Sequence, residues 1–260
     1  MESVLLSVDE RGIATLKLNR QECHNAIDSD CADLLTANLE TLSEDEDIRA
    51  VILTGTGISF SAGHDIDALR SHVAASQETL AQQIRQYARL LHTLDTLNKP
   101  TIARVQGAAF GLGVGLIACC DFAIGAADAL FGFSEVRQGN IPGVVTPYVV
   151  RAIGARAARR YLIGSERFNA GKAKRLGLLH QEVQHAMLDN TVEQLIRQLL
   201  INGPIAMNET KRLIREIEHQ SISEPNMERL IEQTASIRIS HEGQEGIAAF
   251  IEHRKPGWIK

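Results

Sequence analysis

Short apolar runs bounded by glycine or proline are the feature that most restricts the fold of this chain. They lie at Ala50–Thr54, Thr101–Val105 and Phe122–Ile124. Such runs predict strands that are covered on both faces. Helical patterns follow them, so strand, loop and helix recur through about the first 180 residues. We therefore expect an α/β fold. The residues show no fixed period, which argues against a tight solenoid.

The two ends of the chain differ in character. The alternating segments Val4–Val8 and Ile13–Leu18 flank a polar turn and predict a β-hairpin. Beyond about residue 186 the pattern becomes amphipathic and helical. The expected helices are Leu188–Ile201, Ile205–Glu218, Asn226–Ser240 and Glu242–Glu252. We therefore divide the chain into an α/β core at 1–190 and a helical region at 191–260. Long amphipathic helices need apolar surface to pack against, which favours oligomerisation.

Charge and composition narrow the range of partners. The formal net charge is -5 and no long basic run occurs, which argues against a nucleic-acid partner. The uncharged run Gly107–Cys120 is too short to span a bilayer, and the first residues lack a signal-peptide pattern. The four cysteines have neither disulfide-framework nor metal-ligand spacing. We expect a cytoplasmic protein that binds neither membrane nor nucleic acid.

The first segment suited to chemistry is Phe60–Ile66, which follows the strand and glycine turn of Val51–Gly57. Small residues before a helix start let backbone N–H groups face a ligand. The alternative is an ordinary loop in which Asp65 caps the next helix.

The second segment is Gly107–Gly115, with glycines at 111, 113 and 115. It has neither the GxGxxG spacing of a dinucleotide site nor the Gly-Lys-Ser/Thr end of a phosphate loop. A tight turn into a helix would aim the positive end of that helix at an anionic oxygen. Glycine used only for close helix packing is the alternative.

The third segment contains Glu135 among Phe131, Phe133, Val136 and Ile141. Apolar neighbours would desolvate this carboxyl and raise its pKa towards the range useful for proton transfer. A surface glutamate that caps a helix is the alternative. No GxSxG elbow, HExxH motif or paired metal spacing occurs in the chain.

Taken in order, these segments resemble the crotonase, or enoyl-CoA hydratase/isomerase, superfamily. The resemblance also includes Asn19–Ala26 and Ala248–Pro256. Ser134–Pro142 and Thr146–Arg151 look most like bacterial methylglutaconyl-CoA hydratase-like members. Each match alone is modest, but together they keep one order over most of the chain.

The resemblance implies a crotonase-like ββα spiral core with a C-terminal helical trimerisation region, assembled as a homotrimer or as a hexamer of two trimers. It also implies that the backbone N–H groups of His64 and Leu112 bind a thioester oxygen, and that Glu135 transfers protons. Gly115 stands where two-glutamate hydratases carry their other carboxylate. We also expect Gly143 at the catalytic site.

The implied substrate is an acyl group carried as a coenzyme A thioester, with no metal and no further cofactor. The positions expected to contact it are Glu22, Cys23, His24, Ala26, Ala62, Gly63, Asp65, Ile66 and Gly111. Phe250 and Lys255 are expected to reach coenzyme A from a neighbouring subunit.

Three functions follow from this resemblance. The first is an enoyl-CoA hydratase that adds water across the 2,3-double bond through an enolate, on a branched or carboxylated acyl group, as in fatty acid or branched-chain amino acid degradation. The second is an enoyl-CoA isomerase that uses a single glutamate, which Gly115 favours. The third is a CoA-thioester-binding assembly protein with little catalysis.

Overall fold

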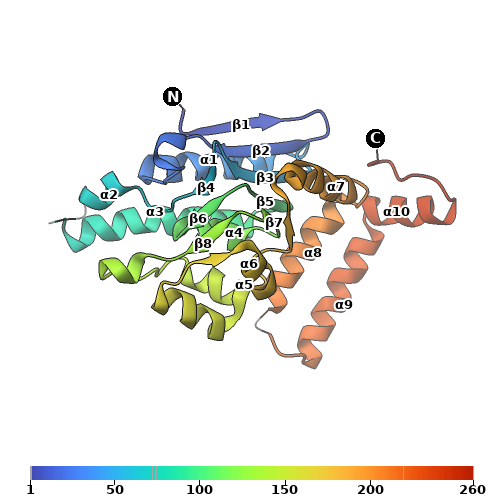
Figure 1. Ribbon diagram of the computed structural model, residues 1–260. Coiled ribbons are helices and arrows are strands. Elements are labelled where there is room, and N and C mark those ends of the chain that lie inside the picture. The colour runs from blue at the N-terminus through green and yellow to red at the C-terminus, as the bar shows by residue number, and fades with distance from the viewer. Residues whose placement is uncertain (1, 72, 74, 219, 260) are drawn as a thin grey trace.

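The chain folds into two β-sheets surrounded by helices (Figure 1). The computed structural model describes every residue except 1, 72, 74, 219 and 260. The strands are β1 (Val4–Val8), β2 (Ile13–Leu18), β3 (Ala50–Gly55), β4 (Ser59–Ser61), β5 (Thr101–Val105), β6 (Ala108–Phe110), β7 (Phe122–Ala126), β8 (Leu130–Gly132), β9 (Phe168–Asn169) and β10 (Gln181–Val183).

The larger sheet has the strand order β1-β2-β3-β5-β7-β10. Strands β1 and β2 form the predicted antiparallel hairpin, and the other pairs are parallel. Side chains alternate between its faces, as the two-residue period of a strand requires. Leu16 and Leu53 point into the main core, while Ile13 and Ile52 point into a second core on the opposite face. Both faces are therefore covered at β3, β5 and β7, whereas β1 is exposed except at Val4.

The smaller sheet has the order β4-β6-β8-β9. Each of β3, β5 and β7 in the larger sheet is followed by a short strand, β4, β6 or β8, in the smaller one. A helix comes next each time, so the unit is ββα and the expected spiral is confirmed. The short strands were not foreseen, because three residues beside glycines carry no alternation that a sequence pattern can reveal.

The helices lie around these sheets (Figure 1). They are α1 (Ser29–Glu44), α2 (Ile66–Ser71), α3 (Gln77–Thr96), α4 (Leu112–Cys119), α5 (Thr146–Ala158), α6 (Ala170–Leu176), α7 (Leu188–Leu200), α8 (Pro204–Ile217), α9 (Glu224–Ile239) and α10 (His241–Ile251). Four shorter turns are η1 (Gln21–Cys23), η2 (Glu135–Gln138), η3 (Arg159–Ile163) and η4 (His185–Met187). The side chain of Asp28 caps α1 by accepting from the N–H of Cys31, at 2.8 Å.

Helix α7 packs on the larger sheet, while α8 to α10 extend to one side (Figure 1). The expected boundary at 190/191 lies within α7, whose Leu188, Val192 and Ile196 are buried against the sheet. The later helices keep apolar side chains exposed. These are Ile205, Ile214, Ile217, Ile231, Ile239, Ile247 and Phe250. The division into two regions and the trimer stay predictions.

Among the described residues, no helix combines the length and apolar character needed to cross a bilayer.

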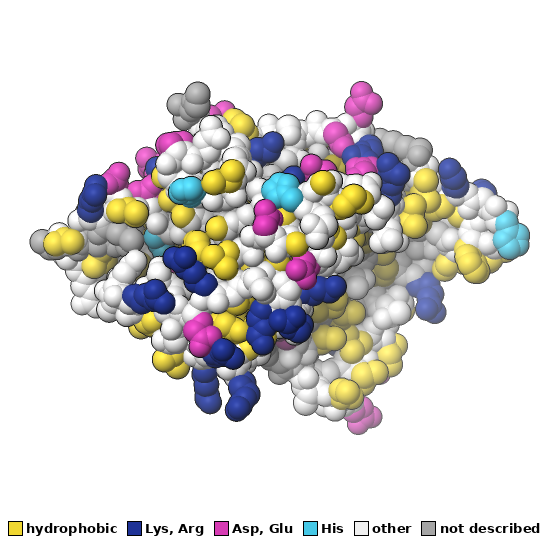
Figure 2. Space-filling model, in the orientation of Figure 1, with side chains coloured by type: hydrophobic (Ala, Val, Ile, Leu, Met, Phe, Trp, Pro, Cys, Tyr) yellow, Lys and Arg dark blue, Asp and Glu magenta, His cyan; other side chains and the backbone are white. Residues whose placement is uncertain are grey.

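The surface charge is unevenly distributed. Lysine and arginine side chains gather over α5, η3 and α6, in the lower half of the view in Figure 2. This basic surface includes Arg156, Arg159, Arg160, Lys174 and Arg175. A net charge of -5 therefore coexists with a local positive surface.

We predict that Ile196→Ala lowers the free energy of unfolding by about 3 kcal/mol, because it leaves a cavity between α7 and the larger sheet. Ile58→Ala, at a side chain that is 79% exposed, serves as the control and should change it by less than about 0.5 kcal/mol. Denaturant unfolding at matched protein concentration measures both. Equal small effects would contradict the packing of α7 into the core.

Candidate functional site

The loop after β4 directs one backbone N–H group towards α4. The carbonyl of Gly63 accepts from the N–H of Ile27 at 2.7 Å, and the N–H of Asp65 donates back to the carbonyl of Ile27 at 3.1 Å. Since carbonyl and N–H groups point in opposite directions across a trans peptide, the N–H of His64 points away from Ile27. The His64 ring packs edge-on against Tyr87 of α3, with ring centroids 4.7 Å apart.

The N-terminus of α4 presents a second N–H group. Helix α4 begins at Leu112, and the carbonyl of Gly111 accepts from the N–H of Gly115 at 3.1 Å. By the same peptide geometry, the N–H of Leu112 points out of the helix end. Gly111 has a φ of 48°, a left-handed value that favours glycine at this turn.

These two peptides lie against each other. A side-chain carbon built on Gly63 would lie 2.6 Å from the carbonyl oxygen of Phe110 and 3.3 Å from the nitrogen of Leu112. A carbon built on Gly113 would lie 2.7 Å from the carbonyl oxygen of Ser61. The two backbone segments therefore touch with no side chain between them. The residues expected to supply the two N–H donors, 64 and 112, therefore lie on adjacent backbone segments.

Glu135 lies beside the N-terminus of α4. It is the first residue of η2 and is 9% exposed, so the alternative of a surface glutamate is wrong. Its Oε1 atom would lie 2.5 Å from a carbon built on Gly111, and its buried Oε2 atom has no hydrogen-bond partner among the described residues. Burial raises the pKa of this carboxyl, although the backbone N–H groups of Glu135 and Ser134 act in the opposite direction.

The resulting arrangement suits reactions in which negative charge develops on an oxygen while a proton moves. Two N–H groups and a helix N-terminus stabilise an oxyanion. A carboxyl beside them, with a pKa raised by burial, suits a group that accepts and returns a proton.

The structure fills the position of Gly115 with hydrocarbon. A carbon built there would lie 2.6 Å from Cγ1 of Val145 and 3.3 Å from Cδ2 of Leu91. Sequence reasoning missed both residues, because they come from distant segments. Gly143 lies exposed in the loop between η2 and α5, and a carbon built on it would lie 3.8 Å from Cδ1 of Ile141.

The segment expected to bind coenzyme A does lie beside the loop after β4. Glu22 and Cys23 belong to η1, and His24 follows with a positive φ of 54°. Nδ1 of His24 is 3.0 Å from the hydroxyl of Ser59, and the carbonyl of His24 accepts from the N–H of Ala62 at 2.9 Å. Two hydrogen bonds at His24 therefore join this segment to β4 and the loop that follows it.

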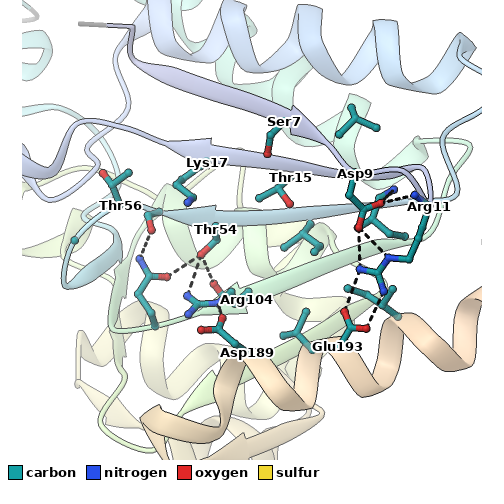
Figure 3. Close-up of a pocket in the computed structure, with 18 of the residues that line it drawn as sticks. Ser7, Asp9, Arg11, Thr15, Lys17, Thr54, Thr56, Arg104, Asp189 and Glu193 are labelled. Carbon is teal, nitrogen blue, oxygen red and sulfur yellow. Dashed lines mark hydrogen bonds and ion pairs between the residues drawn. The ribbon is translucent and has the colours of Figure 1, made fainter.

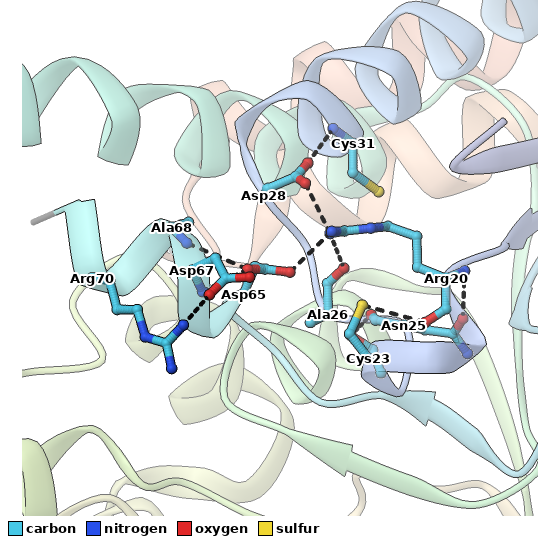
Figure 4. Close-up of polar contacts among 11 residues, drawn as sticks. Arg20, Cys23, Asn25, Ala26, Asp28, Cys31, Asp65, Asp67, Ala68 and Arg70 are labelled. Carbon is cyan, nitrogen blue, oxygen red and sulfur yellow. Dashed lines mark hydrogen bonds and ion pairs between the residues drawn. The ribbon is translucent and has the colours of Figure 1, made fainter. Parts of the chain in front are cut away.

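Arg20 holds this region together and was not singled out from the sequence (Figure 4). Its guanidinium forms ion pairs with Asp28 at 2.9 Å and Asp65 at 3.0 Å, and it donates to the carbonyl of Ala26. Asp65 also accepts from the N–H groups of Asp67 and Ala68, as the capping alternative requires. Ile66, the next residue, is 69% exposed.

Two buried amide side chains fix strand β4, and they too were missed. Asn25 and Gln106 each donate to the carbonyl of Ser59, at 2.8 Å and 2.7 Å. Gln106 also donates to the carbonyl of Gly55 and accepts from the hydroxyl of Thr54. The register of β4 relative to the larger sheet is therefore set by side chains as well as by the backbone.

The C-terminal positions are not brought to this site within one chain. Phe250 is 81% exposed on α10, and Lys255 follows that helix. Helix α10 lies at the opposite end of the molecule from α2 (Figure 1). Contact of these residues with coenzyme A from a neighbouring subunit stays a prediction.

A separate groove of about 750 Å³ lies between the larger sheet and α7 (Figure 3). Arg11 pairs there with Asp9 and Glu193, and Arg104 pairs with Asp189. Because these charges are already matched, the groove offers little unbalanced charge to a ligand. Among the described residues, no group of three or more His, Cys, Asp or Glu side chains is arranged to hold a metal ion.

We predict that Gly113→Ala lowers kcat by about a hundredfold, because the new methyl group pushes α4 away from Ser61 and separates the two N–H donors. The affinity for coenzyme A should change little. Gly164→Ala is the control, since its nearest neighbour would be 3.9 Å away. Steady-state kinetics and direct binding measure both. An unchanged kcat in Gly113→Ala would show that this contact does not set the donor geometry.

Comparisons with known proteins agree with this geometry. A model of the enoyl-CoA hydratase/isomerase family matches residues 9–260. The chain is 39% identical to a crystallised enoyl-CoA hydratase from Shewanella pealeana, with a TM-score of 0.95, over 99% of this chain and 96% of that one.

Curated relatives with different reactions match equally well. The chain is 30% identical over 272 residues to the crotonyl-CoA hydratase of Syntrophomonas wolfei, covering 99% of this chain and 98% of that relative. It is 30% identical over 264 residues to the 1,2-epoxyphenylacetyl-CoA isomerase of Escherichia coli, covering 98% of each. This chain therefore belongs to the enoyl-CoA hydratase/isomerase family and has the crotonase fold.

Proposed function

We propose that this protein is an enoyl-CoA hydratase. A water molecule adds its oxygen to C3 of a 2-enoyl thioester and gives a proton to the carboxylate of Glu135. The electron pair of the double bond moves towards the thioester, so an enolate oxygen forms between the N–H groups of His64 and Leu112. Glu135 then returns the proton to C2, which leaves a 3-hydroxyacyl thioester. Atoms and charges balance with one water consumed.

The observation that carries this proposal is the buried carboxyl of Glu135 beside the N-terminus of α4, with one oxygen that has no hydrogen-bond partner in the described part of the chain. Burial raises the pKa of this carboxyl, which suits it to take and return a proton. Each preorganised N–H donor to the enolate is worth about 3–4 kcal/mol of transition-state stabilisation.

The acyl group we propose is branched or carboxylated. This part rests on the resemblance of Ser134–Pro142 to methylglutaconyl-CoA hydratase-like members. Arg137 follows Glu135 in η2, and its guanidinium donates to the carbonyl of Ser165 at 2.9 Å. Arg137 is exposed two residues after Glu135, so it is the cation that we propose for a substrate with a distal carboxylate.

Coenzyme A is proposed to lie along Glu22–His24 and Ala62–Ile66, with Phe250 and Lys255 contributed by a neighbouring subunit of a trimer or hexamer. The hydrogen bonds from His24 to the β4 segment support a continuous binding edge.

An isomerase is the second candidate. The hydrocarbon of Val145 and Leu91 at Gly115 favours it, because no carboxylate can stand there without displacing them. In that reaction Glu135 takes a proton from C2 of a 3-enoyl thioester and returns it to C4. No water is consumed.

We predict that Glu135→Gln lowers turnover by about a hundredfold to ten-thousandfold, because the amide neither accepts nor returns the proton. Coenzyme A binding should stay nearly intact. Glu228→Gln, at an exposed position on α9, is the matched control. Unchanged turnover in Glu135→Gln would rule out this carboxyl as the proton-transfer group.

The pH dependence follows from the raised pKa of Glu135. Hydration requires the ionised carboxylate, so kcat/KM should fall about tenfold per pH unit below that pKa. We predict that the midpoint of this acidic limb lies above the ordinary glutamate range. A limb at or below that range would contradict the desolvation argument.

Product identity separates the candidates. We predict that 2-enoyl-CoA substrates gain the mass of one water, with branched and carboxylated acyl groups turned over fastest. A 3-enoyl-CoA converted at constant mass, with no hydration of 2-enoyl-CoA, would favour the isomerase. Tight acyl-CoA binding with no turnover across the panel would favour the assembly protein. Mass spectrometry of the products distinguishes all three.

A further inference from the structure

One short β-bridge fixes the direction of the His64 peptide. Ile27 and His64 pair in parallel. The N–H of Ile27 donates to the carbonyl of Gly63 at 2.7 Å, and the carbonyl of Ile27 accepts from the N–H of Asp65 at 3.1 Å. These two hydrogen bonds lie on either side of His64, so its own N–H is directed away from Ile27. A movement of one segment of the bridge relative to the other would turn this N–H group.

A single guanidinium contacts both segments of this bridge (Figure 4). Arg20 donates to the carbonyl of Ala26 at 2.9 Å and forms an ion pair with Asp28 at 2.9 Å. These two residues flank the bridge on the first segment. On the second segment, Arg20 forms an ion pair with Asp65 at 3.0 Å. We call Arg20 and these three partners the Arg20 clamp, because together they hold the two segments at one spacing.

The clamp is anchored at its base and shielded at its tip. The N–H of Arg20 donates to the side chain of Asn25 at 3.0 Å, and its carbonyl accepts from the N–H of Asn25 at 2.8 Å. The side chain of Arg20 is 21% exposed and that of Asp65 is 8% exposed. Water and salt therefore screen this ion pair less than a pair on the surface.

We infer that Arg20 is a positioning residue for the N–H group of His64 that is proposed to bind the thioester oxygen. The inference rests on that donor role. Arg20 acts through the two residues that follow the donor peptide and face it across the bridge, Asp65 and Ile27. Without the clamp the peptide turns more freely, and a hydrogen bond to a developing negative charge weakens as its angle departs from linear. The loss should therefore fall on the transition state more than on coenzyme A binding.

The first test uses Asp65→Asn, which removes one ion pair of the clamp and keeps the cap of α2. Oδ1 of this carboxyl accepts from the N–H groups of Asp67 and Ala68, whereas its Oδ2 pairs with Arg20. With the 2-enoyl-CoA that is hydrated fastest, kcat should fall about tenfold to a hundredfold, while KM changes less than about threefold. Arg20→Gln should lose as much. Arg20→Lys should lie between Arg20→Gln and the wild type, since an ammonium lacks the planar fork of a guanidinium.

Arg151→Gln is the matched control. Arg151 also pairs with two carboxylates from distant segments, Asp95 of α3 and Glu218 directly after α8, and its side chain is 33% exposed. Its replacement should lower thermal stability as Arg20→Gln does, yet leave kcat and KM at their wild-type values. An equal fall of kcat in Arg151→Gln, or a wild-type kcat in both Arg20→Gln and Asp65→Asn, would overturn the inference.

The thioester carbonyl gives a second readout that a merely structural role would not move. Crotonyl-CoA with an isotope label at this carbonyl is bound to Glu135→Gln, and its infrared band is compared with that of the free thioester. N–H groups aimed at the oxygen weaken the C=O bond and lower the frequency of the band. Adding Asp65→Asn or Arg20→Gln should return the band towards its free position, while adding Arg151→Gln should leave it in place. A band that neither clamp variant moves would count against the inference.

Failure of the inference is distinguishable from failure of the proposed function. If the bound carbonyl band lies at its free position in Glu135→Gln alone, the donor role proposed for residues 64 and 112 is wrong. If Glu135→Gln keeps full turnover, the proposed proton transfer is wrong. If both proposals hold while the clamp variants keep the wild-type kcat and the same band, only the role of Arg20 is wrong.

Discussion

The site depends on direct contact between two backbone segments. The loop after β4 and the N-terminus of α4 approach so closely that only glycine fits at residues 63 and 113. The two N–H groups proposed as donors thus come from different ββα units whose backbones are in contact. Since backbone donors are fixed by the fold, they need little reorganisation when charge develops on a bound oxygen. In the donor role proposed for residues 64 and 112 the side chain plays no direct part, which is compatible with histidine and leucine at these positions.

The burial and the raised pKa of the Glu135 carboxyl depend on the same packing. The glycine at 111 gives its Oε1 atom room beside the helix end, and burial in η2 removes water from it. Gly115, one turn further along α4, is also a glycine, yet Val145 and Leu91 occupy the space beside it. The carboxyl of Glu135 therefore lies at the start of α4, and the next turn of this helix packs against hydrocarbon.

Local patterns in the sequence predicted the elements that carry their own periodicity. The hairpin at Val4–Val8 and Ile13–Leu18 was predicted to the residue, and the burial of Glu135 followed from its aromatic neighbours. Such local patterns do not predict contacts between segments that are distant in the sequence. The two ion pairs of Arg20 and the filling of Gly115 by Val145 join segments that only the folded chain brings together.

The carbonyl of Ser59 accepts from both Asn25 and Gln106, which uses both of its lone pairs. Gln106 is anchored in turn to Thr54 and Gly55 of the larger sheet. These hydrogen bonds fix the position of β4 relative to the larger sheet. A shift of β3 would therefore displace β4 and the loop after it together, with every N–H group still present but pointing in a different direction.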